Sequence, residues 1–76
     1  MRTEYPERYL ILGLKIAYYR KKEGYTQEAF AEKIGISTNF LAQVEGTGTT
    51  KGVSLETLFK IADALNIPPY KLLELD

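Results

Sequence analysis

Residues 26–45 contain two short helical patterns separated by a glycine, and they constrain the fold more than any other part of this 76-residue chain. Thr26 is suited to cap the first helix, because its hydroxyl can accept a hydrogen bond from a first-turn N–H. Gly35 suits the left-handed backbone at the end of that helix, since glycine has no Cβ to clash. Ser37 is suited to cap the second helix. Two helices joined by so short a turn predict a helix-turn-helix over residues 27–45.

The second helix of this segment has an apolar side and a polar, uncharged side. Leu41 and Val44 are three residues apart, so they share the apolar side. The other side carries Thr38, Asn39 and Gln43. The second helix of a helix-turn-helix can enter a DNA major groove, where amide side chains pair with adenine edges. We therefore predict that these three polar residues contact bases; the alternative is that they are solvated surface residues.

This segment resembles the DNA-binding domain of the phage Cro and C1 repressors, the Xre-type helix-turn-helix family. The matching residues of the motif are Gln27, Ala31, Gly35, Ile36, Leu41 and Val44. Residues 54–73 are similar to the fourth and fifth helices of the family, so the resemblance covers roughly residues 9–75. It implies a structural ion pair between Arg20 and Glu45. It also implies that Gln27 meets a phosphate at its helix N-terminus, although a capping role is the alternative.

Residues 46–53 form a loop rich in glycine and threonine. The backbone N–H groups, the threonine hydroxyls and Lys51 of this loop are suited to bind a phosphate. The alternative is that the loop is only a flexible connection. It departs from the commoner family loop, which is shorter and more basic and contains a proline. The residues that we predict to contact DNA phosphates are Gln27, Ser37, Thr47, Thr49 and Lys51.

Three further helices are expected outside the motif. A first helix starts near Pro6, ends by Gly24 and carries an apolar stripe. Ser54 is suited to cap a later helix that ends at Asn66, and a last short helix follows Pro68. The buried face of the helix after Ser54 is expected to hold Leu55, Leu58, Ile61, Ala62 and Leu65. We also expect Tyr18, Tyr25 and Tyr70 to be packing residues.

These patterns predict an all-α fold, a compact five-helix bundle in which residues 1–76 form one DNA-binding domain after a short lead-in at 1–5. The chain has no histidine and no cysteine, so general acid–base catalysis and metal binding lack their usual residues. We expect no enzyme activity, no cofactor, no metal and no small-molecule ligand. The longest apolar run is too short to span a membrane, and no secretion signal opens the chain, so a cytoplasmic protein is expected.

The overall charge of the chain is only a partial argument against binding to nucleic acid. Ten basic and ten acidic residues cancel, whereas DNA-binding domains often have a basic surplus. Residues 1–38 carry seven basic and five acidic groups, a net of +2, and residues 39–76 carry three and five, a net of −2. A small domain with this asymmetry can still present a positive face to DNA.

The sequence thus predicts a transcriptional regulator, a repressor, that binds double-stranded DNA through residues 37–45. The alternative is a helix-turn-helix protein-interaction module, such as an antitoxin or an oligomerisation partner. One recognition helix reads few base pairs, so we expect two copies on DNA, as a weak homodimer or a dimer that forms on the DNA. The expected contact surfaces are residues 49–53 and the C-terminal residues Ile67, Tyr70 and Leu73.

Overall fold

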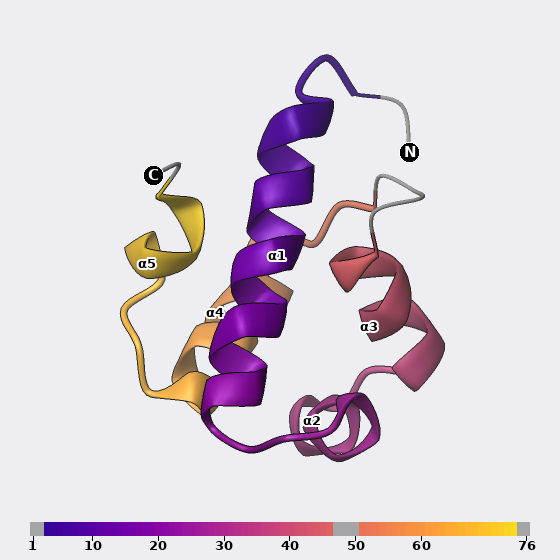
Figure 1. Ribbon diagram of the computed structural model, residues 1–76, viewed down its shortest axis with the longest axis vertical. Coiled ribbons are helices and arrows are strands. Elements are labelled where there is room, and N and C mark those ends of the chain that lie inside the picture. The colour runs from indigo at the N-terminus through magenta and orange to yellow at the C-terminus, as the bar shows by residue number, and fades with distance from the viewer. Residues whose placement is uncertain (1–2, 47–50, 75–76) are drawn as a thin grey trace.

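The computed structural model describes residues 3–46 and 51–74, and these residues form five α-helices without a strand (Figure 1). The helices are α1 (Pro6–Lys22), α2 (Gln27–Ile34), α3 (Thr38–Glu45), α4 (Leu55–Leu65) and α5 (Tyr70–Leu73). Helices α2 and α3 are the two helices of the predicted helix-turn-helix. The expected all-α, five-helix fold is confirmed.

Local side-chain and backbone interactions set the ends of the helices where the sequence predicted them. The hydroxyls of Thr26, Ser37 and Ser54 accept hydrogen bonds of 3.0, 3.0 and 3.1 Å from backbone N–H groups in the first turns of α2, α3 and α4. Gly35 ends α2 with φ of 76°, and Asn66 ends α4 with φ of 57°. Both lie in the left-handed region that glycine and asparagine tolerate best, which explains why the helices stop there.

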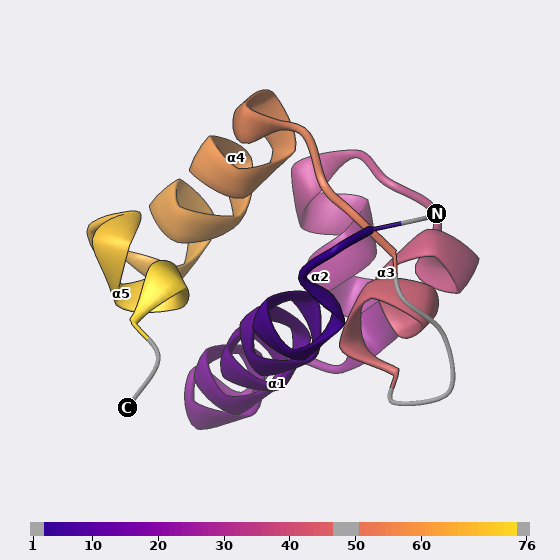
Figure 2. The same ribbon diagram turned by 90° about the horizontal axis from the view of Figure 1, so that it is seen from above.

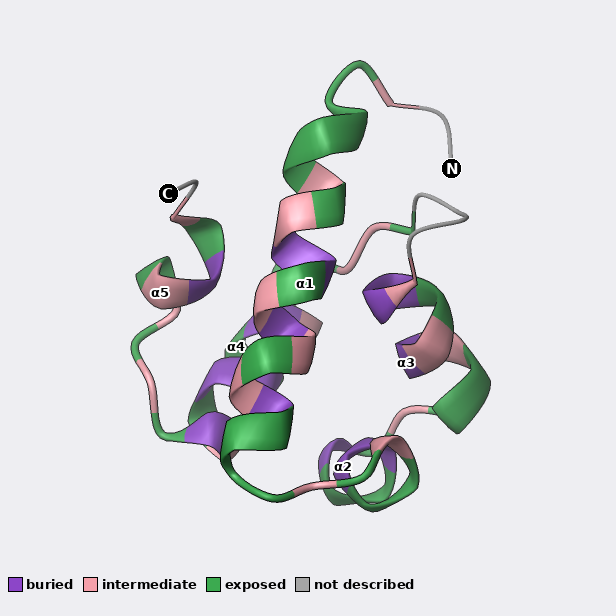
Figure 3. Ribbon diagram, viewed as in Figure 1, coloured by how far each residue is buried: buried purple, intermediate pink, exposed green. Residues whose placement is uncertain are grey.

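The core is built from all five helices, with α1 as the element that contacts most of the others. Helix α1 packs against α3, α4 and α5, and α2 packs against α3 and α4 (Figures 1 and 2). Figure 3 shows the buried residues on the sides of the helices that face one another. The buried apolar residues are Leu12, Ile16, Phe30, Ala31, Ile34, Leu41, Val44, Leu58, Ile61, Ala62, Leu65 and Leu72.

One residue expected on a buried face, Leu55, lies at the surface instead, and two of the three expected packing tyrosines are largely exposed. Leu55 is 68% exposed, because it is the first residue of α4 and lies at the end of the helix, beyond the core-facing residues. Tyr18 and Tyr70 are each 59% exposed. Tyr25 does pack against the core, with its ring centroid 5.4 Å from that of Phe30. None of the helices in the described ranges has the length and apolar character needed to cross a membrane.

Candidate nucleic-acid interface

Helix α3 presents an uncharged polar surface beside its N-terminus. Thr38, Asn39 and Gln43 are all exposed, while Leu41 and Val44 on the opposite side are buried. Ser37 is exposed just before the helix, with its hydroxyl held by the N–H of the third helical residue. The three residues predicted to contact bases therefore lie on one accessible side of a short helix. The uncharged amide and hydroxyl groups on this surface can donate hydrogen bonds to base edges and accept hydrogen bonds from them.

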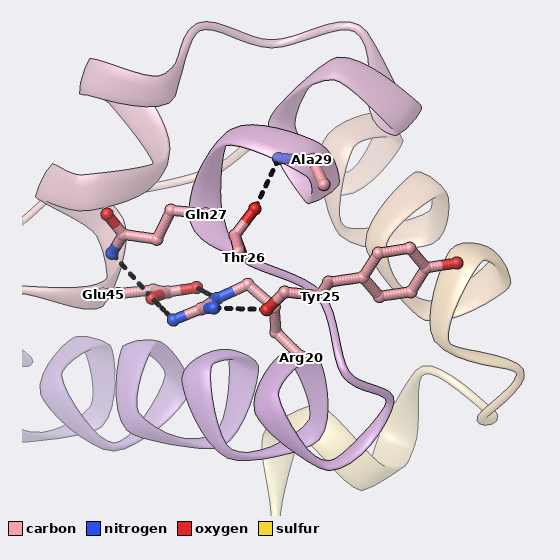
Figure 4. Close-up of polar contacts among 6 residues, drawn as sticks. All are labelled: Arg20, Tyr25, Thr26, Gln27, Ala29 and Glu45. Atoms are coloured by element: carbon pink, nitrogen blue, oxygen red, sulfur yellow. Dashed lines mark hydrogen bonds and ion pairs between the residues drawn. The ribbon is translucent and has the colours of Figure 1, made fainter.

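A buried ion pair fixes α3 to α1. The guanidinium of Arg20 donates to both carboxylate oxygens of Glu45, through Nε to Oε2 at 2.7 Å and through Nη2 to Oε1 at 2.9 Å (Figure 4). Its Nη1 donates to the carbonyl oxygen of Tyr25 at 2.7 Å. Arg20 is 5% exposed and Glu45 is 9% exposed. Two parallel bonds to a carboxylate also restrict orientation, so the pair holds the end of α3 in place.

Gln27 joins this buried network, which the sequence did not predict. Its Nε2 donates to Oε1 of Glu45 at 3.0 Å, and its amide oxygen points away from the carboxylate in Figure 4. The cap of α2 is Thr26, so Gln27 does not serve as the capping residue. Gln27 is the first residue of α2, where backbone N–H groups lack partners within the helix. Its position thus links the N-terminus of α2 to the last residue of α3.

A second feature missed from the sequence is the close approach of α1 to α3 at Gly13. A Cβ added to Gly13 would lie well inside van der Waals contact of the Val44 carbonyl oxygen. The carbonyl belongs to the backbone of α3, so it cannot move aside as a flexible side chain would. Glycine at this position therefore sets how closely the two helices pack. The only signal in the sequence was an isolated glycine within an apolar helical run.

Lys51 lies beside α3, although it follows the loop. Its Nζ is 5.8 Å from the ring centroid of Phe40, and the lysine is exposed. Phe40 is half-buried and packs against the core, so it connects the polar surface of α3 to the interior. No role for Phe40 was predicted from the sequence. Thr47 and Thr49, the other loop residues predicted to contact phosphates, lie outside the described residues.

The basic residues before the motif divide into one that is buried and two that are exposed. Arg20 is neutralised by Glu45, so only Lys21 and Lys22 of this run remain at the surface.

Within the described residues, no cluster of histidine, cysteine, aspartate or glutamate side chains could hold a metal ion. An open surface groove of about 520 Å³ lies between α2 and α4 and includes Tyr25, Lys33 and Asp63.

Comparison with known proteins gives consistent similarities over most of the chain. The helix-turn-helix family model HTH_3 matches residues 16–72. YazB of Bacillus subtilis, an uncharacterized HTH-type transcriptional regulator, is 39% identical over 57 residues, which are 75% of this chain and 80% of YazB. SinR of Bacillus subtilis, an HTH-type transcriptional regulator, is 31% identical over 64 residues, which are 84% of this chain and 57% of SinR. The chain thus spans little more than half the length of SinR.

Solved structures agree with these similarities in fold. The crystal structure of SinR in complex with DNA superimposes with a TM-score of 0.75 at 32% identity, over 83% of this chain and 98% of that chain. The restriction-modification controller protein C.AhdI from Aeromonas hydrophila gives a TM-score of 0.77 at 30% identity, over 84% of this chain and 94% of that chain.

Proposed function

Since this chain belongs to the Cro/C1-type helix-turn-helix family of DNA-binding transcriptional regulators, we propose that it represses transcription by placing α3 in the major groove of an operator. The observation that carries this proposal is the exposed, uncharged polar side of α3, held rigidly against α1 by the bond between Arg20 and Glu45. A repressor of this kind acts where the DNA is, in the cytoplasm of a bacterial cell.

Base recognition is assigned to the residues nearest the N-terminus of α3. Asn39 can pair with the N6 and N7 groups of an adenine through both ends of its amide, which gives it the largest share of specificity. Gln43 lies one turn later and reaches a neighbouring base. Thr38 contacts a thymine methyl group or a phosphate. All three side chains are exposed, so none must leave a packed position to reach DNA.

Phosphate contacts are assigned to residues around this surface. The first turn of α2 offers unpaired N–H groups, and the amide oxygen of Gln27 is turned away from Glu45. Lys51 supplies a positive charge beside α3 through its position over Phe40. Ser37 completes the described set, and Thr47 and Thr49 remain predictions from the sequence. These contacts fix the register of α3 on the duplex without reading sequence.

Two copies are proposed to bind one operator. A single α3 reads few base pairs, and each mismatched pair costs only about 1–3 kcal/mol, so one half-site gives little discrimination. Twofold symmetry then places the half-sites one turn of DNA apart, about 34–36 Å, and favours a pseudo-palindromic operator.

Selection of bound duplexes from a random pool tests this function. The chain is expected to enrich a pseudo-palindromic sequence, and Asn39→Ala is expected to lose about 1–3 kcal/mol on that sequence and to relax the preference at one base pair. Lys22→Ala serves as the control, since Lys22 is exposed on α1 and outside the proposed interface. Equal losses on enriched and random DNA for Asn39→Ala would contradict the assignment of base contacts.

The alternative function is a protein-interaction module, and the exposed side of α5 is the observation that favours it. Tyr70 is 59% exposed and Leu73 is 55% exposed, so α5 offers an apolar surface to a partner. The same selection separates the two functions. Failure to enrich any duplex at low salt would favour the interaction module, because sequence-independent phosphate contacts are strongest under that condition.

A further inference from the structure

The outer side of α1 carries a row of apolar side chains that the core does not use. Leu10, Leu14 and Tyr18 are spaced four residues apart and are 38%, 50% and 59% exposed. Residues at this spacing lie one above another on a helix. Figures 1 and 2 show α1 at the outside of the helix assembly, and Figure 3 shows exposed residues along its outward side. The buried residues of α1, which lie on its other side, are Leu12, Gly13, Ile16 and Arg20.

Two opposite charges flank this row. Glu7 and Lys21 are both exposed, and each is seven residues from Leu14. Seven residues are close to two helical turns, so both charged residues lie in line with Leu14. We call the five residues Glu7, Leu10, Leu14, Tyr18 and Lys21 the outer strip. It has an acidic end, an apolar middle and a basic end.

We propose that two copies of this chain pair through the outer strip, and not through the loop and C-terminal surfaces expected from the sequence, with their α1 helices antiparallel and a twofold axis at Leu14. In this arrangement Leu14 meets its own copy, and Leu10 lies opposite Tyr18 because each is four residues from the axis. Glu7 lies opposite Lys21 at both ends of the contact. The same patch on both copies thus complements itself, as a twofold interface requires.

The charges select the antiparallel arrangement over the parallel one. Parallel α1 helices would bring Glu7 next to Glu7 and Lys21 next to Lys21, and like charges repel. The antiparallel arrangement replaces both repulsions by attractions while keeping the apolar residues in contact. It also matches the left-handed packing of neighbouring helices, in which apolar residues recur every three or four positions.

The pairing has a consequence for DNA that rests on the proposed function. The twofold axis of two antiparallel helices is perpendicular to the plane that contains them. Helix α1 lies between α5 and α3, and its free side faces away from α4 (Figures 1 and 2). If a second copy docks on this free side, the plane of the two α1 helices passes between α5 and α3. The twofold axis that relates the two copies is perpendicular to this plane, so it runs from the α5 side towards the α3 side. Both α3 helices then lie on the same side of the pair.

The contact is small, so the dimer is weak. Each copy contributes only five residues, which is fewer than the roughly 20–30 residues a side of a standard specific interface, so the contact belongs with weak, transient ones. We expect a dissociation constant between roughly 10 µM and 1 mM in the absence of DNA.

Sedimentation equilibrium of the chain without DNA tests the contact. Wild-type chains are expected to associate reversibly, and Leu14→Glu is expected to raise the dissociation constant at least about tenfold, because two carboxylates would meet on the axis. Leu55→Glu is the matched control, since Leu55 is a more exposed leucine outside the outer strip and its substitution leaves association unchanged. Far-UV circular dichroism verifies that both variants are folded.

Charge reversal tests the antiparallel register. Glu7→Lys alone and Lys21→Glu alone each place like charges opposite one another and weaken self-association. A mixture of these two variants restores pairing, because one copy then carries two lysines where the other carries two glutamates. The double variant E7K/K21E also restores pairing with itself.

Two results would overturn the proposal: a monomer throughout the concentration range, or association that Leu14→Glu leaves intact. If Tyr70→Gln abolishes the association that Leu14→Glu leaves intact, the contact lies on α5. DNA binding is measured separately, on a duplex with one half-site that a single copy occupies. If the chain self-associates but does not bind this duplex, the result counts against the proposed function alone. If it binds the duplex but does not self-associate, the result counts against the outer strip alone.

Discussion

Removing one partner of the ion pair between Arg20 and Glu45 is expected to destabilise the fold severely. Glu45→Ala would remove both acceptors of the two short bonds and leave a guanidinium that is 5% exposed with only the Tyr25 carbonyl. Stranding a buried charge in this way costs about 3–5 kcal/mol. A chain of 76 residues has a total free energy of unfolding of about 4–11 kcal/mol. The single substitution therefore removes about a quarter of the stability or more.

Arg20→Ala is expected to cost a similar amount but for a different reason. Glu45 would keep one bond, from Gln27 Nε2 at 3.0 Å, while its other oxygen and the Tyr25 carbonyl lose their donors. In the double variant R20A/E45A neither charge is stranded, so the two losses should not add. We expect a coupling of about 2–3 kcal/mol, near the upper end of the range for residues in contact.

The assay is urea unfolding followed by circular dichroism at 222 nm for the four members of this cycle, with Lys22→Ala as an exposed control. Thermal unfolding gives a second readout, since a loss of 3 kcal/mol lowers the midpoint of a domain of this size by at least about 12 °C. Strict additivity of the two substitutions would refute the reasoning. So would a loss for Glu45→Ala no larger than that for Lys22→Ala.

Three further predictions follow from contacts of α3. Gly13→Ala should destabilise the chain by about 1–3 kcal/mol or more and displace α3, because the new Cβ meets the Val44 carbonyl; a stable variant with wild-type DNA affinity would contradict this. Gln27→Ala should lower stability by about 1.5–3 kcal/mol through its lost bond to a charged oxygen, as denaturant midpoints would show. Lys51→Ala should weaken binding to all DNA sequences alike and reduce the salt slope by about 1, measured by titration at several salt concentrations.

Local chemistry made the ends of the helices predictable from the sequence. A capping hydroxyl at Thr26 or Ser37 acts on an N–H three residues away, and the left-handed residues Gly35 and Asn66 need no distant partner. The polar side of α3 was also readable, because the spacing of its apolar residues fixes which side is buried. These features depend on residues within one helical turn.

Packing between helices decided what the sequence could not. The burial of Leu55 was predicted wrongly, because an apolar residue is buried only where another element covers it, and a helix pattern does not say how far that cover extends. For the same reason the sequence did not predict that Tyr18 and Tyr70 would be more than half exposed.

The sequence by itself determined five helices, the N-terminal caps of α2, α3 and α4, and the polar side of α3, since each follows from residue types and spacing within one segment. A resemblance supplied the pairing of Arg20 with Glu45, which are 25 positions apart. Only the tertiary structure decided that Gln27 bonds to Glu45, that Gly13 lies against Val44 and that Lys51 lies over Phe40. The physical reason is that each of these contacts joins segments whose distance is fixed by how the whole core packs, and no local pattern encodes that distance.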